Sequence, residues 1–538
     1  MSMYDDAVIF TLEPGSVFVI PSSVLNAYGY GGGPTSFVIG NANNNIIFFE
    51  YGQDGAPGAS VHGLDGDDTI YAGLGQGNYY NGDSGNDTFY AGRPGTWQYN
   101  FFDGGSGIDT IHLRPTVNGF VNLNSDIFSN IENVNVTNIR AILTATDADN
   151  VISGLLKRVY ALGGNDRIDG QYFQGTGYFD GGAGTDTLDF TTVTRTDSTQ
   201  PGVAFNMNVT DVDHGAVSIE IVLGSAYADV FTGNAEDSRI EGRKGNDTIF
   251  GGAGADSILG NDGNDELHGG DDNDVLYGGS GDDRIFGDAG NDTLIGNVGA
   301  DELIGGLGDD IYFISDSNAI TVELADQGND TIHTRVSWAL DANFENLSSA
   351  GVDLTLTGNL TANVIIGDRG ANIIDGMSGA DTLRGGADND FIKGSRGNDV
   401  LRGDAGADTL DGGMDNDTLF GGVGLDVLTG GTGSDRFHFT ALPDSGRTIT
   451  LADRITDFSQ AELDRIVLSL IDADATMADD QDFDFIGFGS FSGNAGELRA
   501  FYRDGNTFVS GDVDGNGASD IMIELTGMVA LTSADFIL

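Results

Sequence analysis

Aspartate residues recur every nine positions through two long stretches of the chain, and closely spaced glycines precede each of them. Two examples of the unit are residues 251–259, GGAGADSIL, and residues 278–286, GGSGDDRIF. Glycines at positions 1, 2 and 4 of the unit permit a tight turn whose backbone carbonyls point inward. Aspartate at position 6 adds a carboxylate oxygen, and calcium prefers carbonyl and carboxylate oxygens. The repeat therefore predicts calcium binding at its turns.

The repeats form two arrays, with ten consecutive units in residues 224–313 and nine in residues 358–438. The aspartates at position 6 of these arrays are the candidate calcium ligands: Asp229, Asp247, Asp256, Asp265, Asp274, Asp283, Asp292, Asp301, Asp310, Asp381, Asp390, Asp399, Asp408, Asp417, Asp426 and Asp435. Turn carbonyls are expected to complete the ligand sets, at glycines such as Gly242, Gly251, Gly260, Gly269, Gly278, Gly287, Gly376, Gly385, Gly394, Gly403, Gly412 and Gly421.

The unit G-G-x-G-x-D-x-U-x, in which U is a large apolar residue, resembles the calcium-binding repeat of the RTX (repeats-in-toxin) family. The resemblance implies an all-β fold, namely a calcium-bound parallel β-roll whose turns alternate between two edges. In that family each ion lies between turn n and turn n+2, so ten and nine turns imply about 15 calcium ions. The resemblance also implies a secreted, extracellular protein.

Positions 7 to 9 of each unit are expected to form a short strand whose position 8 faces the interior. Position 8 is apolar in nearly every unit, as at Ile249, Leu267, Ile285, Leu383 and Leu401. One unit cannot bury this side chain alone, whereas stacked units make a continuous narrow core. The alternative, a flexible loop rich in glycine and aspartate, would not keep position 8 apolar.

Residues 61–223 carry degenerate copies of the unit, separated by connectors in which longer strands are expected. Four aspartates at position 6 of these copies are further candidate calcium ligands: Asp68, Asp87, Asp109 and Asp186.

Connectors in three places contain a similar glutamate, at Glu132, Glu220 and Glu345, the last within the connector 314–357. In each place the distance from the glutamate to the point where the repeats resume is a multiple of nine. Because unrelated loops would not preserve this phase, the spacing predicts that the solenoid continues through the connectors.

Residues 1–60 contain no recognisable repeat, but residues 8–12 and 17–20 are apolar runs with high β propensity. We expect this segment to cap the open end of the solenoid, since exposed strand edges invite association. The alternative is a contact through which one molecule joins the next, and the two roles are compatible.

Residues 439–538 differ in composition from the arrays. With the end of the second array they contain DRFHF at 435–439, ADRITDF at 452–458 and LTSADFIL at 531–538, which resemble the C-terminal domain of the serralysin metalloproteases. That resemblance implies a β-rich cap on the roll and a final tail, residues 535–538, that a type I secretion exporter recognises.

Within this domain, Asp512, Asp514, Asn516 and Asp520 have a spacing similar to that of an EF-hand loop. Ile523 stands where the bidentate glutamate of an EF-hand is expected. The segment therefore fits a calcium site or a polar hairpin turn about equally well.

Composition narrows the classes of partner. Lys and Arg total 23 against 83 Asp and Glu, so the net charge of −60 disfavours nucleic acid and anionic lipid surfaces as partners. The chain has no cysteine, which excludes disulfides and thiolate metal sites. No apolar stretch approaches the length of a membrane-spanning helix. The first Lys or Arg is Arg93, so no secretory signal peptide is expected, in keeping with type I export.

Catalytic signatures are not found in the sequence. None of the six histidines is followed by glutamate, so the H-E-x-x-H motif of the serralysins is missing, and no G-x-S-x-G motif occurs. We therefore expect a non-enzymatic, extracellular structural protein that assembles with copies of itself into a surface layer, filament or matrix. The alternatives are a secreted hydrolase with its active site within residues 113–220, and an adhesin.

Overall fold

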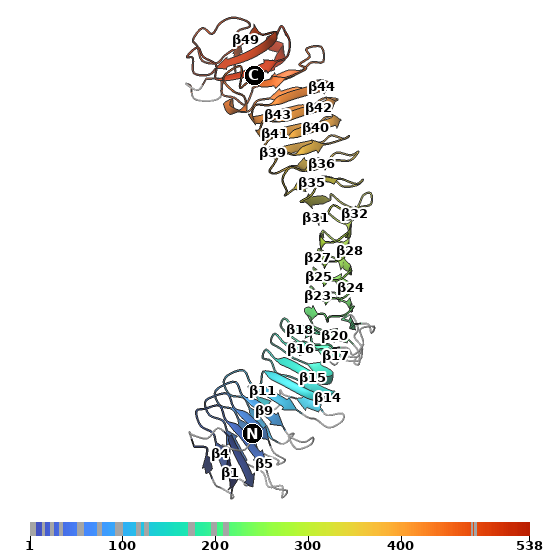
Figure 1. Cartoon of the computed structure of the whole chain (residues 1–538), viewed down its shortest axis with the longest axis vertical. Coiled ribbons are helices and arrows are strands. Elements are labelled where there is room, and N and C mark those ends of the chain that lie inside the picture. Colours follow the sequence, from blue (N-terminus) through green and yellow to red (C-terminus); the bar gives the residue numbers. More distant parts are fainter. Residues whose placement is uncertain are drawn as a thin grey trace. The chain divides into compact units, whose positions relative to one another are not determined.

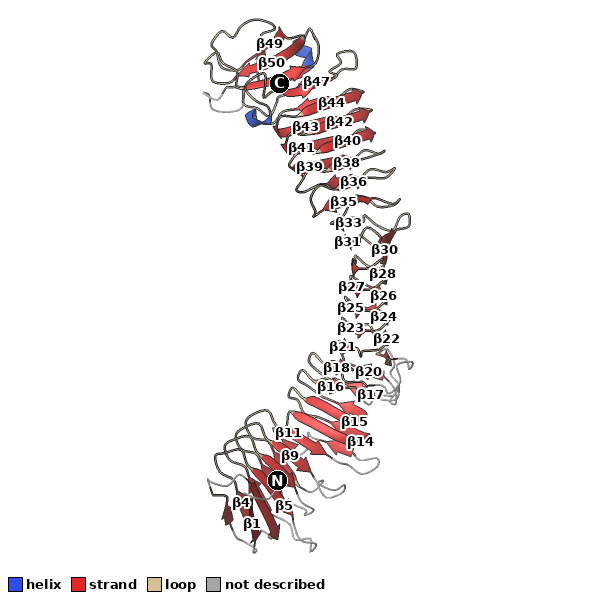
Figure 2. Cartoon of the chain, in the orientation of Figure 1, coloured by secondary structure: helices blue, strands red, loops and turns tan. Residues whose placement is uncertain are grey.

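A computed structural model of the chain describes residues 7–12, 17–21, 26–31, 36–50, 59–72, 78–91, 100–113, 120–122, 128–170, 178–194, 202–207, 215–474, 477 and 481–538. The chain forms two compact units, Met1–Asp271 and Asp272–Leu538. Each consists of short strands joined by tight turns, and the described part contains no α-helix (Figure 2). The expected all-β fold, a parallel β-roll, is confirmed.

In the first unit, successive coils place alternate strands in a long parallel sheet and in shorter parallel sheets (Figure 1). The long sheet contains β1 (Ala7–Leu12), β3 (Asn26–Gly31), β5 (Ile46–Glu50), β7 (Thr69–Ala72), β9 (Thr88–Ala91), β11 (Thr110–Leu113), β12 (Phe120–Asn122), β14 (Asn133–Thr144), β15 (Val151–Tyr160), β16 (Arg167–Asp169), β17 (Tyr178–Asp180), β18 (Thr187–Asp189), β20 (Gly215–Val217), β21 (Ile221–Leu223), β23 (Arg239–Lys244) and β25 (Ser257–Asp262). The shorter sheets contain β2 (Val17–Val19), β4 (Ser36–Ile39), β6 (Ala59–His62), β8 (Tyr79–Asn81), β10 (Phe101–Asp103) and β13 (Phe128–Ser129), and then β19 (Ala204–Asn206), β22 (Val230–Thr232), β24 (Thr248–Ala253) and β26 (Glu266–Asp271).

The second unit repeats this arrangement. Its first sheet contains β27 (Val275–Ser280), β29 (Thr293–Val298), β31 (Ile311–Ile314), β33 (Thr331–Thr334), β35 (Asn346–Ser349), β37 (Val364–Ile366), β39 (Thr382–Ala387), β41 (Val400–Gly406), β43 (Thr418–Gly424), β45 (Arg436–His438), β47 (Arg465–Val467) and β52 (Phe536–Ile537). The other strands are β28 (Arg284–Ala289), β30 (Glu302–Leu307), β32 (Ile320–Val322), β34 (Trp338–Ala339), β36 (Thr355–Thr357), β38 (Ile373–Asp375), β40 (Phe391–Arg396), β42 (Thr409–Met414), β44 (Val427–Thr432), β46 (Asp453–Ile455), β48 (Asp484–Phe485), β49 (Glu497–Arg503), β50 (Asn506–Asp512) and β51 (Ile521–Leu525). Two 3₁₀ turns, η2 (Leu442–Asp444) and η3 (Ser533–Asp535), complete it.

Strands within the arrays pair with an offset of two repeat units, which together make one coil. Leu401 lies beside Leu419, and Leu410 lies beside Leu428. These position-8 side chains are fully buried, as predicted, and stack into the core of the roll. The array strands are longer than the three residues expected, because positions 2 and 3 of the next unit also pair, as Gly413 does with Gly431.

The connectors preserve the coil geometry. Asn133 pairs with Val151, Val222 with Ile240, and Asn346 with Val364, each in parallel and each with the same offset as in the arrays. The continuous solenoid inferred from the multiples of nine is therefore confirmed at these three pairings, and the alternative of three unrelated loops is wrong.

The roll pattern also extends beyond the recognisable repeats. Near the N-terminus, β1 pairs with β3, β3 with β5, and β5 with β7, all in parallel. After the second array, β46 and β47 continue the two sheets, whereas β49, β50 and β51 form antiparallel pairs. The last strand, β52, pairs with β47. Among the described residues, no helix is long and apolar enough to cross a membrane.

Candidate calcium sites

The position-6 aspartates form hydrogen-bonded stacks along the edges of the roll. In the second unit the backbone N–H of Asp399 donates to Oδ1 of Asp417 at 2.8 Å, and that of Asp417 donates to Oδ1 of Asp435 at 2.9 Å. The other edge has the same arrangement, where the N–H of Asp408 donates to Oδ1 of Asp426 at 2.8 Å. Each carboxylate thereby uses one oxygen to accept a backbone hydrogen bond from the preceding coil.

The second oxygen of these carboxylates lies buried without a hydrogen-bond partner. This holds for Oδ2 of Asp68, Asp87, Asp109, Asp166, Asp186, Asp247, Asp292, Asp310, Asp381, Asp390, Asp399, Asp408, Asp417, Asp426, Asp435 and Asp453. A buried carboxylate oxygen without a partner is costly, and proteins normally pair such oxygens or coordinate a cation with them. A regular row of these oxygens therefore fits a row of bound cations.

The glycine at position 1 shows where a cation would lie. A methyl group added at Gly412 would come closer than 3.0 Å both to Oδ2 of Asp417 and to the carbonyl oxygen of Gly430. The aspartate of one turn and the glycine carbonyl of the turn one coil later thus face the same space. The same relation recurs at Gly394 and Gly403. Two oxygen types from two successive turns of one edge suit calcium, which takes six to eight oxygen ligands.

Burial governs the electrostatics of the stacks. Burial, together with the negative charges of Asp399 and Asp435, raises the pKa of Asp417 to about 8. It likewise raises the pKa of Asp247 to about 8 and that of Asp453 to about 9. A divalent cation beside these oxygens would favour the ionised form and offset the repulsion between neighbouring carboxylates.

The model of one protein family matches the chain at residues 60–79, 223–258, 259–294, 277–312, 357–392, 384–419 and 411–441. These segments are RTX calcium-binding nonapeptide repeats. Repeats of this type bind calcium. No catalytic family is indicated for the chain. No curated protein sequence matches it. The matched segments end at residue 441, so the likeness of residues 439–538 to the serralysin C-terminal domain stays a prediction.

All 20 aspartates predicted from the RTX repeats lie in the interior, and each is at most 3% exposed. Further aspartates that the repeat pattern did not predict occupy the same position, among them Asp330, Asp453 and Asp464. Asp453 and Asp464 accept the backbone N–H groups of Asp426 and Asp435, at 2.9 and 3.0 Å, and so extend both stacks beyond the second array. Each begins an Asp-Arg-Ile triplet, the same as the end of a repeat unit, and this was the signal that could have revealed them.

The connector glutamates end individual runs of stacked aspartates. Oε2 of Glu132 accepts the N–H of Asp109 at 2.7 Å, and Oε2 of Glu345 accepts the N–H of Asp330 at 2.8 Å. Glu220 does the same for Asp186 at 2.7 Å. Each glutamate therefore occupies the position-6 place in its coil, which explains why the spacing to the next repeat is a multiple of nine.

The EF-hand-like segment forms the turn between the antiparallel strands β50 and β51. Carboxylate oxygens of Asp512, Asp514 and Asp520 lie within 4.8 Å of one another. Asp512 accepts the N–H groups of Gly515 and Gly517, both at 2.8 Å, and Asp520 lies 3.4 Å from the Arg447 guanidinium. These contacts are compatible with both alternatives, a calcium site and a polar hairpin turn.

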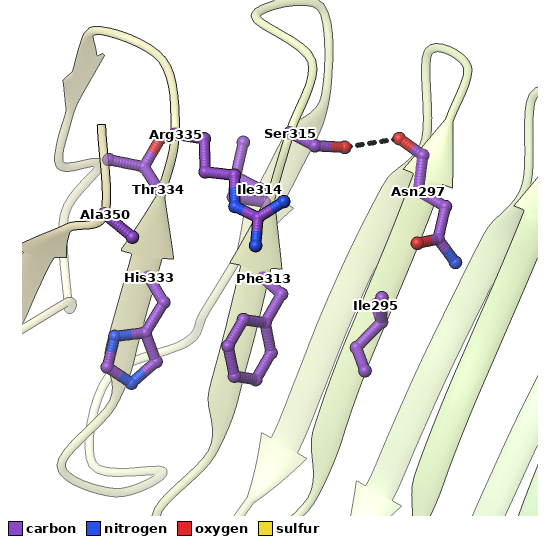
Figure 3. Close-up of a pocket in the computed structure, with 9 residues that line it drawn as sticks. All are labelled: Ile295, Asn297, Phe313, Ile314, Ser315, His333, Thr334, Arg335 and Ala350. Carbon is purple, nitrogen blue, oxygen red and sulfur yellow. Dashed lines mark hydrogen bonds between the residues drawn. The ribbon is translucent and has the colours of Figure 1, made fainter. Parts of the chain in front are cut away.

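A surface hollow of about 300 Å³ lies over β29, β31 and β33 in the second unit (Figure 3). Its lining is mainly apolar, and Phe313 and His333 stack with ring centroids 5.1 Å apart. Arg335 extends over it, and no carboxylate lines it. A second hollow, beside Arg384 and Arg402, has one carboxylate in its lining, that of Asp404. Neither hollow offers the paired carboxylates that the hydrolase alternative requires, and both lie outside residues 113–220.

The raised pKa values predict that the calcium-free chain is more ordered in acid. Unfolded aspartates have a pKa of about 3.9, whereas burial raises the pKa of Asp399 to about 6 and that of Asp417 to about 8. Protonation therefore favours the calcium-free folded state at low pH, and this contribution disappears as the pH rises through about 6 to 8. We expect the circular dichroism of metal-free protein to show more β structure near pH 4.5 than near pH 8.

Calcium-saturated protein is the control for this experiment, because a bound divalent cation favours the ionised form of a carboxylate. We expect its spectrum to change little between about pH 5 and pH 8. Equal disorder of the calcium-free protein at both pH values would contradict the assignment of raised pKa values to the stacked aspartates.

Proposed function

We propose that this protein is a secreted calcium-binding RTX β-roll with a non-enzymatic structural role outside the cell, in a surface layer, filament or matrix. The observation that carries the proposal is the row of buried carboxylate oxygens without partners, which recurs from coil to coil in both units. A solenoid with so many buried anions needs cations to fold, so its folding would follow the calcium concentration around it. The chain would then be unfolded in the calcium-poor cytosol and folded in the calcium-rich exterior.

Calcium would be held by the position-6 aspartates through Oδ2 and by position-1 glycine carbonyls of the turn one coil later. The convergence at Gly412, between Asp417 and Gly430, supports this ligand set. When bound, calcium supplies positive charge and a rigid link between successive coils. The chain's own residues position the link, since the Oδ1 hydrogen bonds orient each carboxylate in the folded roll.

Type I export would precede folding. Asp535 and Phe536 of the proposed export tail are buried, and Phe536 pairs with Ile466 of β47. Oδ2 of Asp535 also accepts a hydrogen bond from Gln460 at 2.7 Å. An exporter that recognises this tail must therefore bind it while the chain is unfolded, which agrees with a chain that folds only after reaching calcium.

Self-assembly would use the open end of the first unit. Strand β2 ends its six-stranded sheet, and its Val17 and Val19 side chains are 59% and 56% exposed. An apolar strand at the edge of a sheet offers backbone and side-chain contacts to another chain. Residues 1–60 would then serve as the contact segment, a role that remains compatible with capping.

Electron microscopy of purified protein tests this role. We expect ordered arrays or filaments in calcium and dispersed chains after chelation. Val19→Lys should abolish the assemblies because it places a charge on the exposed edge, while the calcium-dependent circular dichroism stays unchanged. The matched control is Val298→Lys, at an exposed valine of the second unit. Dispersed wild-type particles in both conditions would contradict the structural role without affecting calcium-dependent folding.

A further inference from the structure

Three buried acidic residues of the second unit meet where the first array ends. Carboxylate oxygens of Asp310, Glu323 and Asp330 lie within 4.8 Å of one another. The three residues are 1%, 6% and 1% exposed. Asp310 and Asp330 belong to one aspartate stack, since the N–H of Asp310 donates to Oδ1 of Asp330 at 2.8 Å. Glu323 lies outside the repeat units recognised in the sequence, and its carboxylate is the unusual member of the cluster.

The position of Glu323 explains how it enters the stack. It follows Gly305 by two repeat lengths and therefore occupies position 1 of a turn, where regular units have glycine. That turn reaches its aspartate, Asp330, two residues later than a regular unit does. At Gly305, an added methyl would come closer than 3.0 Å to Asp310 Oδ2 and Glu323 Oε1. In a regular turn such as that at Gly412, a glycine carbonyl oxygen takes the place of this glutamate oxygen.

A tyrosine hydroxyl closes the same cluster. Tyr312 stands at position 8, normally an aliphatic residue, and its hydroxyl donates to Oε1 of Glu323 and accepts the N–H of Gly305 at 2.5 Å. A methyl group added at Gly305 would also come closer than 3.0 Å to this hydroxyl. The phenol ring is fully buried, so it holds this oxygen at a fixed place in the cluster.

Two oxygens of the cluster have no protein partner. They are Oδ2 of Asp310 and Oε2 of Glu323, both buried. None of the ion pairs formed by the described residues includes Asp310, Glu323 or Asp330. Burial raises the pKa of Asp310 to about 8 and that of Glu323 to about 7. Three adjacent carboxylates without a cationic side chain leave negative charge that the protein does not balance.

We propose that Asp310, Glu323 and Asp330 form a three-carboxylate variant of the repeat site, which binds a hard divalent cation with higher affinity than the regular repeat sites do. Sites for such ions gain affinity with the number of charged ligands. Here a glutamate carboxylate replaces a neutral glycine carbonyl, and the Tyr312 hydroxyl holds that carboxylate in place. This site takes the place of the regular array site at Asp310, and its cation binding does not depend on the proposed structural role of the protein.

Terbium ions provide the probe, because Tb³⁺ is similar in size to calcium, prefers carboxylate-rich sites and luminesces when a nearby tyrosine absorbs light. We expect micromolar Tb³⁺, added to full-length protein in millimolar calcium, to give saturable tyrosine-sensitised emission. Glu323→Gln should raise the half-saturating Tb³⁺ concentration at least about tenfold, because it removes one charged ligand. The control Glu302→Gln removes a partly exposed carboxylate of β30 and should leave the titration unchanged.

The variant Tyr312→Phe tests whether the bound Tb³⁺ lies beside Tyr312. It keeps the three carboxylates but removes the sensitising phenol, so tyrosine-sensitised emission should fall while directly excited Tb³⁺ luminescence persists. Circular dichroism in millimolar calcium establishes that each variant is folded. Identical Tb³⁺ titrations of folded wild type and Glu323→Gln would overturn the proposal. Undiminished sensitised emission from Tyr312→Phe would also overturn it, even if the array sites bind calcium as proposed.

Discussion

Removal of calcium is expected to unfold the greater part of this chain. Extracellular calcium modules bind with dissociation constants of about 10⁻⁴ to 10⁻³ M. At about 1 mM calcium and the tighter limit, each site stabilises the folded state by about 1.4 kcal/mol. About 15 such sites contribute roughly 20 kcal/mol, which exceeds the net stability of a typical domain. Without calcium this term is lost.

The net negative charge of the chain also opposes folding without calcium. The chain carries a net charge of −60, and about 15 bound calcium ions would halve it. In the calcium-free roll the stacked carboxylates lie 18 residues apart in sequence but in adjacent coils, as Asp399 and Asp417 do. Their repulsion and desolvation oppose folding unless they are protonated or bound to a cation. The calcium-free chain at neutral pH is therefore expected to be expanded.

Far-ultraviolet circular dichroism and size-exclusion chromatography measure this transition. We expect EGTA near pH 7.5 to abolish most β signal and to increase the hydrodynamic radius, because an unfolded chain is more expanded than a folded one. Calcium should restore both properties, whereas magnesium at equal concentration should restore neither, because Mg²⁺ demands a smaller octahedral shell. A chain that keeps its β signal and radius after exhaustive chelation would contradict calcium-dependent folding.

Asp417→Asn is expected to remove one calcium site without removing a hydrogen bond. Asparagine keeps an oxygen to accept the N–H of Asp399 but replaces Oδ2 with an amide nitrogen, which cannot bind a cation. The chain itself has asparagine at this position of the repeat, at Asn372, whose Oδ1 accepts the N–H of Leu354 at 3.1 Å. The substitution is therefore compatible with the stack at saturating calcium.

The expected effect is a loss of about 1.4 kcal/mol per substituted site at about 1 mM calcium. The triple variant Asp399→Asn/Asp417→Asn/Asp435→Asn should lose about 4 kcal/mol and need more calcium to fold. Urea unfolding at fixed calcium and calcium titration of the circular dichroism both measure the change.

Asp415→Asn is the matched control for this series. Asp415 lies in the same turn as Asp417, its side chain is exposed, and its positive φ of 77° suits asparagine as well as aspartate. The control makes the same change in net charge, so it separates a lost ligand from a general electrostatic effect. Equal calcium midpoints for Asp415→Asn and Asp417→Asn would exclude Asp417 as a ligand.

The nine-residue period by itself determined the roll, its buried position 8 and the places of its stacked aspartates. The reason is that every array coil contains two units, so a residue such as Leu401 must lie beside Leu419. The spacing of residues along the sequence therefore predicts which residues pair between adjacent coils. The same reasoning explains why Glu132 and Glu345, at multiples of nine, fall in line with the aspartates.

Only the tertiary structure showed which residues join the stacks where coils change length. Asp426 meets Asp453 across 27 residues and Asp435 meets Asp464 across 29, whereas regular stacked aspartates are 18 residues apart, so a search at that fixed spacing misses both. The two-residue insertion before Asp330 likewise conceals that Glu323 occupies a glycine's place beside Asp310. Hydrogen bonding between coils fixes which residues are adjacent, and it tolerates loops of any length outside the paired strands.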